Sequence, residues 1–217
     1  NQMILFMNEN QVREEDRDKI ILQRHVPGPD TNVVFCAMHI ANGNVSSAIT
    51  GRKIFQYPLG FGVASACVTE VLPQIEKSTK KILVDLNYAG PAEAEFKWDD
   101  RDKKYQLIEI NPRSWANNSL AEMAGQDIIF NTYCWAAGND YSYINPKSWK
   151  KIVWIDEVTF VGSVYRCLKK FDMDYKSFSI ILFSKKVFST FSINDPVPFF
   201  FTVKNVIKNR FFSKVVF

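Results

Sequence analysis

The sequence predicts an α+β fold, and three features of its first 140 residues lead to that class. Two pairs of strand-like segments are expected to form hairpins, 33–40 with 45–50 and 94–98 with 105–111. Asn42-Gly43, between the first two segments, is a dipeptide that suits a tight hairpin turn. A helix is expected from Pro73, because proline at the first helical position loses no hydrogen bond. Antiparallel hairpins mixed with helices favour an antiparallel sheet with packed helices.

The helix from Pro73 is expected to pack through one apolar face. Its apolar residues recur at helical spacing, opposite a lysine-rich side: Ile75, Ile82, Leu83 and Leu86. A further helix is expected from Ser119. Residues 1–20 are expected to form a short strand and then a polar helix or loop. These elements complete the sheet-and-helix pattern of residues 1–140.

The region after about residue 140 has a different composition. It is rich in Trp, Phe and Lys, and no catalytic motif is recognisable in it. We therefore expect two parts, residues 1–140 and a carboxy-terminal extension of residues 141–217. The chain begins at Asn1 directly before an apolar run and ends at Phe217 within another. Both ends are expected to be cuts through a longer protein.

The composition excludes several classes of protein. The chain has 217 residues, 47% of them hydrophobic and 23% charged, and no apolar run approaches the length of a membrane span. The net charge of +4 comes from scattered basic residues, so neither a nucleic-acid nor a membrane partner is expected. Four cysteines lie far apart without a CxxC pair, which predicts buried thiols in a reducing cytoplasm: Cys36, Cys67, Cys134 and Cys167.

Acidic residues on the second hairpin form the most informative pattern. Side chains alternate along a strand, so Glu93 shares a face with Glu95, and Glu109 shares one with Asn111. A turn around Asp102 would place Glu95 directly across from Glu109, where two carboxylates repel each other. A divalent cation such as Mg²⁺, which prefers oxygen ligands, removes that repulsion. The alternative from spacing alone is a solvated face that carries incidental acids.

Glu95, followed fourteen residues later by Glu109-Ile-Asn111-Pro-Arg113, resembles the metal-binding signature of the ATP-grasp enzymes. The similarity is greatest to the carbamoyl-phosphate synthetase-like branch of that superfamily. The resemblance implies the carboxy-terminal part of an ATP-grasp fold, with ATP and two Mg²⁺ ions as cofactors. It implies that Glu95, Glu109 and Asn111 hold the metal ions. It also implies that Arg113 contacts phosphate or the reacting carboxylate.

An upstream segment, residues 22–30, resembles the interdomain strand and hinge of the same superfamily. The resemblance implies that Gln23 lies near the adenine amino group and that the backbones of Arg24 and Val26 contact the adenine. It further implies that Asp30 binds the ribose hydroxyls. From the residues alone, Gln23 is an edge-strand residue and Asp30 a turn former.

Arg52-Lys53 is a basic pair between the two matching segments. The resemblance implies that one basic side chain here reaches the ATP phosphates, with Lys53 the expected residue and Arg52 the alternative. A solvated basic pair is a further alternative. The amino-terminal domain and the lid of an ATP-grasp enzyme find no match here. The chain is therefore expected to hold about half of an active site and to be inactive alone.

The resemblance implies an ATP- and Mg²⁺-dependent carboxylate-amine ligase, which activates a carboxylate as an acyl phosphate for attack by an amine. Asp195-Pro196-x-Pro198 also resembles the ends of ligases of the D-aspartate ligase type. One alternative is phosphorylation of bicarbonate or carbamate, and another is an inactive ATP-binding module. The expected partners are a small carboxylate and an amine, and a homo-oligomer is left open.

Overall fold

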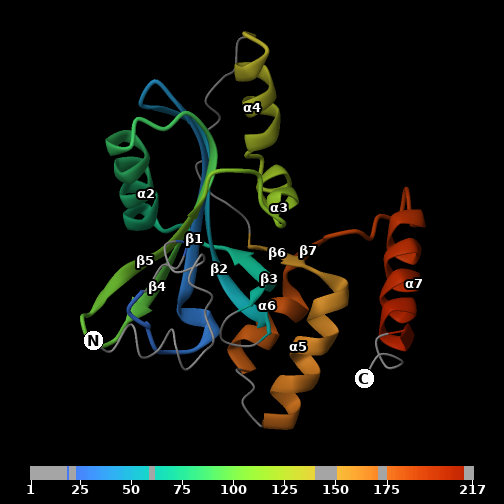
Figure 1. Cartoon of the computed structure of the whole chain (residues 1–217). Helices are drawn as coiled ribbons and strands as arrows, with labels where there is room; N and C mark the ends of the chain where they lie inside the picture. The colour runs from blue at the N-terminus through green and yellow to red at the C-terminus, as the bar shows by residue number, and fades with distance from the viewer. Residues whose placement is uncertain (1–18, 20–22, 59–61, 140–150, 171–174, 213–217) are drawn as a thin grey trace.

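The computed structural model describes residues 19, 23–58, 62–139, 151–170 and 175–212, and in these residues the strands form one mixed sheet (Figure 1). The strands are β1 (Val33–Ala41), β2 (Asn44–Tyr57), β3 (Val63–Thr69), β4 (Gly90–Asp99), β5 (Lys104–Asn111), β6 (Ile152–Ile155) and β7 (Lys185–Phe188). Their order is β5-β4-β1-β2-β3-β6-β7. Neighbouring strands are antiparallel except β6 and β7, which are parallel. With the helices that pack on this sheet, the predicted α+β class is confirmed.

Both predicted hairpins are present, and the first has the expected turn. Asn42 and Gly43 have φ angles of 50° and 74°. Such positive angles suit the turns that match the twist of antiparallel strands. The sequence did not predict β3, whose small residues are mostly buried and lack an alternating pattern. The predicted elements within residues 1–18 lie outside the described residues.

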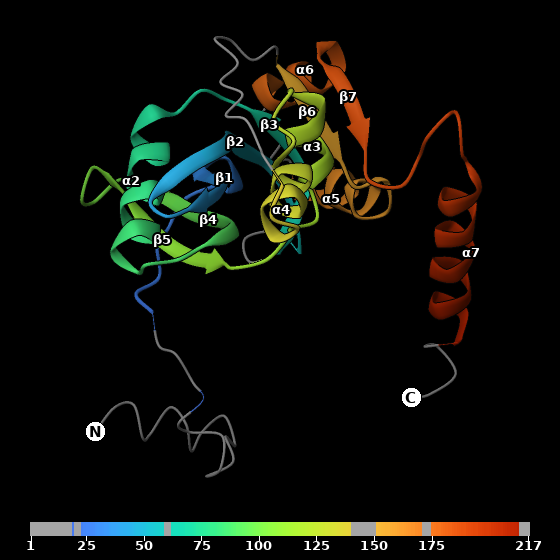
Figure 2. The same cartoon turned by 90° about the horizontal axis from the view of Figure 1, so that it is seen from above.

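The described helices flank the sheet on both sides (Figures 1 and 2). They are α2 (Pro73–Asp85), α3 (Asn118–Met123), α4 (Ile128–Ala136), α5 (Glu157–Lys170), α6 (Tyr175–Phe183) and α7 (Val197–Phe212), with a short 3₁₀ helix η2 (Asp30–Asn32). Helix α2 packs on β1 and β2 on one face, and α3 and α4 pack on the other. Helix α7 stands apart from the sheet in both views.

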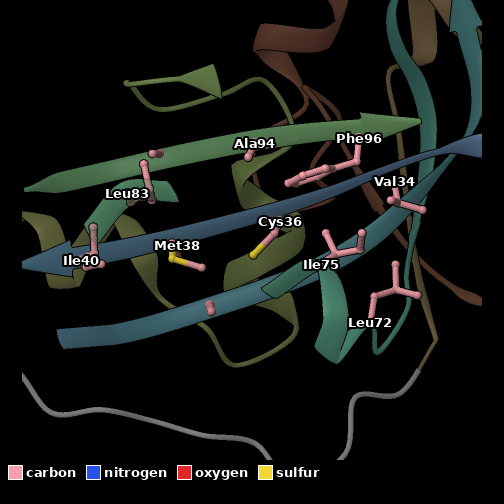
Figure 3. Close-up of a cluster of buried hydrophobic side chains, with 11 residues drawn as sticks. Val34, Cys36, Met38, Ile40, Leu72, Ile75, Leu83, Ala94 and Phe96 are labelled. Carbon is pink, nitrogen blue, oxygen red and sulfur yellow. The ribbon is translucent and has the colours of Figure 1, made fainter. Parts of the chain in front are cut away.

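An apolar core fills the space between the sheet and α2 (Figure 3). Alternate residues of β1 and β4 supply one side of it: Val34, Cys36, Met38, Ile40, Ala92, Ala94 and Phe96. Ile75 and Leu83 of α2 supply the other side, as predicted. The prediction for Leu86 is wrong, because α2 ends at Asp85 and Leu86 is 64% exposed. We call this side of the sheet the α2 face, and the opposite side the cavity face.

Residues beyond 150 continue the sheet. Strand β6 pairs with β3, and α5 packs on β2 and β3. The expected division at residues 140 and 141 stays a prediction, although strands from both sides of it share one sheet. None of the described helices combines the length and the apolar character needed to cross a bilayer. All four cysteines are buried as thiols, as expected.

Candidate active site

A cavity of about 720 Å³ opens on the cavity face of the sheet. Segments far apart in the sequence line it, including residues 23–26, strands β2, β4 and β5, and residues 113–117. Its charged and polar groups include Lys53, Gln56, Glu93, Glu95, Lys97, Gln106, Glu109, Asn111, Arg113 and Asn117. A concave site with converging polar groups is the usual form of a small-molecule binding site.

Strands β4 and β5 bring the predicted metal-binding residues together. Glu95 pairs with Glu109 across the strands, and all three predicted residues line the cavity. The predicted pairing of the two acids on one face is therefore confirmed. Asn111 Nδ2 donates to Glu109 Oε1 at 3.0 Å, and Arg113 Nη2 donates to Asn111 Oδ1 at 3.2 Å. The strand pair thus collects two carboxylates, an amide and a guanidinium at one place.

Lys53 lies on the same face and is buried. Its Nζ is 2.7 Å from Glu95 Oε2 and donates to Gln56 Oε1 at 3.2 Å. Burying a charge is costly unless it is paired and hydrogen-bonded, and this ion pair meets both conditions. The side chain of Lys53 therefore joins β2 to the acidic hairpin inside the cavity, which excludes a solvated basic pair.

Arg52, the alternative basic residue, points to the α2 face. Its guanidinium donates to both carboxylate oxygens of Glu70, at 2.6 and 3.0 Å, and to the carbonyl of Thr31 at 2.7 Å. The Glu70 carboxylate raises the pKa of Arg52 above its ordinary value. Arg52 does not line the cavity. Because side chains alternate along β2, Arg52 lies on the α2 face, where its contacts are structural, and Lys53 lies in the cavity.

Glu93 is a cavity residue that the sequence did not assign to the site. It pairs with Asn111 and is only 5% exposed. Burial raises the pKa of Glu93 to about 8; the neighbouring Glu95 carboxylate adds to the rise, and Lys53 opposes it. The period of two along β4 had already placed Glu93 beside Glu95, but nothing local showed how deeply it is buried.

The predicted hinge residues lie in the cavity wall and contact the β4–β5 hairpin. Gln23 Nε2 donates to the carbonyl of Ile108 at 2.9 Å. Arg24 forms ion pairs with Asp99 and Asp102 at 3.3 and 3.2 Å. Gln23, Arg24 and Val26 all line the cavity. The structure thus brings the hinge segment beside the acidic hairpin, while the roles of its residues toward adenine stay predictions.

Asp30 occupies a different position from the other predicted residues. Its carboxylate accepts from the backbone N–H of Gln56 at 3.1 Å and from Gln56 Nε2 at 2.9 Å. Asp30 does not line the cavity. Its contacts fix Gln56, which in turn contacts Lys53. Ribose binding by Asp30 stays a prediction.

Trp115, Asn117 and Trp154 also line the cavity. Asn117 Nδ2 lies 3.1 Å from the sulfur of Cys67. Burial raises the pKa of Cys67 to about 12, so this thiol is unsuited to be a nucleophile. Trp154 belongs to β6, in a region without a recognisable catalytic motif.

The donor atoms on the hairpin fit a magnesium ion that shares its ligands with a nucleotide. No group of three or more His, Cys, Asp or Glu side chains among the described residues is arranged to hold a metal ion. Mg²⁺ is usually bound by one or two carboxylates together with substrate phosphate oxygens. Glu95, Glu109 and the amide oxygen of Asn111 are donors of that kind, and their role as ligands stays a prediction.

Residues 63–143 match the family model described as "Carbamoyl-phosphate synthase L chain, ATP binding domain". The matched segment includes the acidic hairpin and Arg113. The predicted resemblance to the ATP-grasp superfamily is confirmed over these residues. Among curated proteins, the chain is 27% identical over 128 residues to the D-aspartate ligase of Enterococcus faecium. That match covers 53% of this chain and 30% of the ligase, so the chain spans less than a third of its relative.

Two solved structures are similar to parts of this chain. Biotin carboxylase of Campylobacter jejuni, in its β-γ-ATP complex, is 19% identical, with a TM-score of 0.46 over 58% of this chain and 28% of that one. The phosphoribosylaminoimidazole carboxylase ATPase subunit of Aquifex aeolicus is 13% identical. Its TM-score is 0.45 over 64% of this chain and 47% of that one.

Proposed function

We propose that this chain supplies the nucleotide- and metal-binding half of an ATP- and Mg²⁺-dependent carboxylate-amine ligase. The observation that carries the proposal is the set of Glu95, Glu109 and Asn111 on paired strands, in contact with Lys53 and Arg113. The set lines the cavity, and all of its residues except Lys53 lie in the segment that matches an ATP-binding domain. Because the chain spans 30% of the ligase that it resembles, the activity is proposed for the whole enzyme.

In the proposed reaction, a carboxylate oxygen of the substrate attacks the γ-phosphorus of ATP, and ADP leaves with the electrons of the broken bond. An amine then attacks the carbonyl carbon of the acyl phosphate. Inorganic phosphate leaves and the nitrogen loses a proton, which gives an amide. The attacking carboxylate and the γ-phosphate of ATP are both anionic. Charge neutralisation is therefore the main task of the site.

The residues of the cavity divide this task. Magnesium held by Glu95, Glu109 and Asn111 would neutralise phosphate charge. In the structure Lys53 neutralises Glu95, and a bound cation would free the ammonium to contact a phosphate oxygen. Arg113 lies beyond Asn111 and would add a fixed positive charge next to the reacting carboxylate. Gln23, Arg24 and Val26 would hold the adenine at the hinge end.

A second candidate keeps the fold and changes the acceptor. The family model is named after carbamoyl-phosphate synthase, which favours phosphorylation of bicarbonate or carbamate as the alternative. A coupled assay of ADP release by the whole enzyme, with Mg-ATP and either an amino-acid carboxylate or bicarbonate, separates the two candidates. We expect ADP release that needs Mg²⁺ and the amino-acid carboxylate. Absence of ADP release with every acceptor would contradict both.

Lys53→Met with its neighbour Arg52→Met is the matched pair for this test. Lys53→Met is expected to reduce ADP release strongly, because it removes a cavity cation. Arg52→Met changes a similar side chain on the α2 face and is expected to leave kcat unchanged in the folded fraction. Equal losses of kcat in the two variants would show that Lys53 has no special place in the reaction.

A further inference from the structure

Three buried carboxylates alternate along β4 on the same side of the sheet: Glu93, Glu95 and Asp99. Two of them have a cation as partner. Asp99 Oδ2 is 2.7 Å from Arg101 Nη2, and Glu95 Oε2 is 2.7 Å from Lys53 Nζ. In the part of the chain that the structure describes, the carboxylate of Glu93 has neither an ion pair nor a hydrogen bond. Because buried carboxylates are normally paired, the missing partner of Glu93 is expected on a ligand.

The Glu93 carboxylate is open to the cavity, although the residue is deeply buried. Glu93 is 5% exposed and lines the cavity. Among the described residues, the polar side-chain atoms that are both sealed from solvent and without a partner belong to His39, Ser47, Trp154 and Thr159. The oxygens of Glu93 are also without a partner, yet they are not sealed. A ligand in the cavity can therefore reach them.

The surroundings of Glu93 favour a cation with N–H groups. The carboxylates of Glu95 and Glu109 disfavour a negative charge on Glu93, whereas Lys53 and Arg113 oppose their effect. A positive ligand relieves the repulsion between the carboxylates. Within the described residues, Glu93 belongs to no cluster of three or more acidic, His or Cys side chains that could hold a metal ion. An ionised carboxylate only accepts hydrogen bonds, and a primary ammonium group offers three donors together with a positive charge.

Glu93 lies on the far side of Glu95 from the hinge segment. Arg24 of the hinge contacts Asp99, and Glu93 is six residues away from Asp99 along β4, roughly 20 Å at about 3.3 Å per residue. Glu93 instead pairs across the strands with Asn111, one of the proposed metal ligands. The acyl phosphate would form where the metal ions hold the γ-phosphate. A nucleophile bound at Glu93 would therefore lie close to the carbon that it attacks, which favours the reaction.

We propose that Glu93 binds the ammonium group of the amine substrate, with its N–H groups donating to the two carboxylate oxygens. The ligand thus supplies the third carboxylate of β4 with the cation that Arg101 and Lys53 supply to the other two. The nucleophile is accordingly a primary amine, because a neutral hydroxyl group would leave the carboxylate without a counter-charge. This inference rests on the proposed function, since that function requires an amine next to the acyl phosphate.

Nuclear magnetic resonance of the chain labelled with ¹³C at its glutamate carboxyl carbons tests the subsite directly. Glu93→Gln identifies the resonance of Glu93 by its loss. The probe is methylammonium chloride, added in the presence of MgADP. Potassium chloride is the control for charge without N–H groups, and methanol is the control for size without charge. We expect methylammonium to shift the Glu93 resonance at concentrations where potassium and methanol do not.

Affinities of the variants provide the second arm. Glu93→Gln keeps the size of the side chain and removes its charge, so the dissociation constant for methylammonium should rise by about ten-fold or more, the effect of losing a hydrogen bond to a charged group. MgADP binding should not weaken in Glu93→Gln, because Glu93 is not one of the proposed metal ligands. Glu122→Gln, on the exposed side of α3, is the matched control and should change neither affinity.

The outcomes separate the amine subsite from the nucleotide site. If MgADP binds but methylammonium binds equally to the unsubstituted chain and Glu93→Gln, the subsite is overturned while the nucleotide site stands. An equal shift with potassium would assign Glu93 to a monovalent metal cation, and a loss of MgADP affinity as large as in Glu109→Gln would assign it to magnesium. Both results overturn the proposal. Failure of MgADP to bind the chain at all would contradict the proposed function itself.

Discussion

The two faces of the sheet are built from the same strands and show opposite chemistry. On the α2 face, alternate residues of β1 and β4 are apolar and pack on Ile75 and Leu83. On the cavity face, the residues between them on β4 are charged and nearly as buried: Glu93, Glu95 and Lys97 are 5%, 9% and 6% exposed. Burial of apolar surface stabilises a fold, whereas burial of charge opposes it. The α2 face therefore stabilises the fold, and the buried charges of the cavity face oppose that stabilisation, as is common at functional sites.

Arg52 and Lys53 show the same difference between adjacent residues. Arg52 lies on the α2 face in a bidentate pair with Glu70, whose side chain is partly exposed. Lys53 lies in the cavity and holds a buried carboxylate. Substitutions on the α2 face should change stability without changing function. Substitutions on the cavity face should change function.

The largest expected effect is on turnover. Glu109→Gln keeps the size of the side chain and removes one charge from the proposed metal site. We expect kcat of the whole enzyme to fall by about a thousand-fold, because phosphoryl transfer depends on positioning and charge neutralisation. Steady-state kinetics with Mg-ATP measure this. A kcat within a few-fold of the unsubstituted enzyme would exclude the acidic hairpin as the magnesium site.

Leu83→Ala tests the other face. Leu83 is 1% exposed in the core under α2, so its truncation should lower the free energy of unfolding by about 3 kcal/mol. Denaturant titration gives the loss of stability. The affinity for Mg-ATP of the folded fraction should be unchanged, and a large loss of affinity would show that the faces are not independent.

Lys53→Met and Arg52→Met also differ in stability. Lys53→Met leaves the buried Glu95 without its cation and should cost about 3 kcal/mol of unfolding free energy. Arg52→Met breaks a partly exposed pair and should cost about 1 kcal/mol. Thermal and denaturant unfolding of both variants measure the difference. A greater loss in Arg52→Met would mean that the cavity pair contributes less than its burial indicates.

A smaller effect is expected in the pH dependence of stability. The folded chain keeps the proton of Glu93 up to about pH 8, whereas an ordinary glutamate releases it near 4.5. Between these values the folded state binds more protons than the unfolded state, so Glu93 lowers stability as the pH rises. Glu93→Gln should remove this decline, and Glu122→Gln on α3 should not. Equal slopes in the unsubstituted chain and Glu93→Gln would contradict the deep burial of this carboxyl.

Local pattern was enough to predict the acidic hairpin. The period of two along β4 and β5, with one polar turn, fixes which residues face each other, and Glu95 does pair with Glu109. The choice between Arg52 and Lys53 could not be made in the same way. It depends on the register of β2 against β3, where irregular pairing occurs at Lys53 and Phe55.

The features that were missed depend on contacts between distant segments. Strand β3 is short, rich in small residues and buried, so no alternation marks it. Trp154 enters the cavity wall only because β6 pairs with β3, more than 80 positions earlier in the chain. Burial of Glu93 likewise depends on the whole cavity. Sequence patterns predict neighbours along a strand and across a tight hairpin well, and neighbours from distant segments poorly.

The central claim is that the acidic hairpin binds magnesium together with ATP. The most direct measurement is calorimetric titration of the chain with ATP, with and without Mg²⁺, for the unsubstituted chain, Glu109→Gln and the control Glu122→Gln. We predict that Mg²⁺ strengthens ATP binding by about ten-fold in the unsubstituted chain and the control, and that Glu109→Gln loses this gain. An equal effect of Mg²⁺ on all three proteins would contradict the claim.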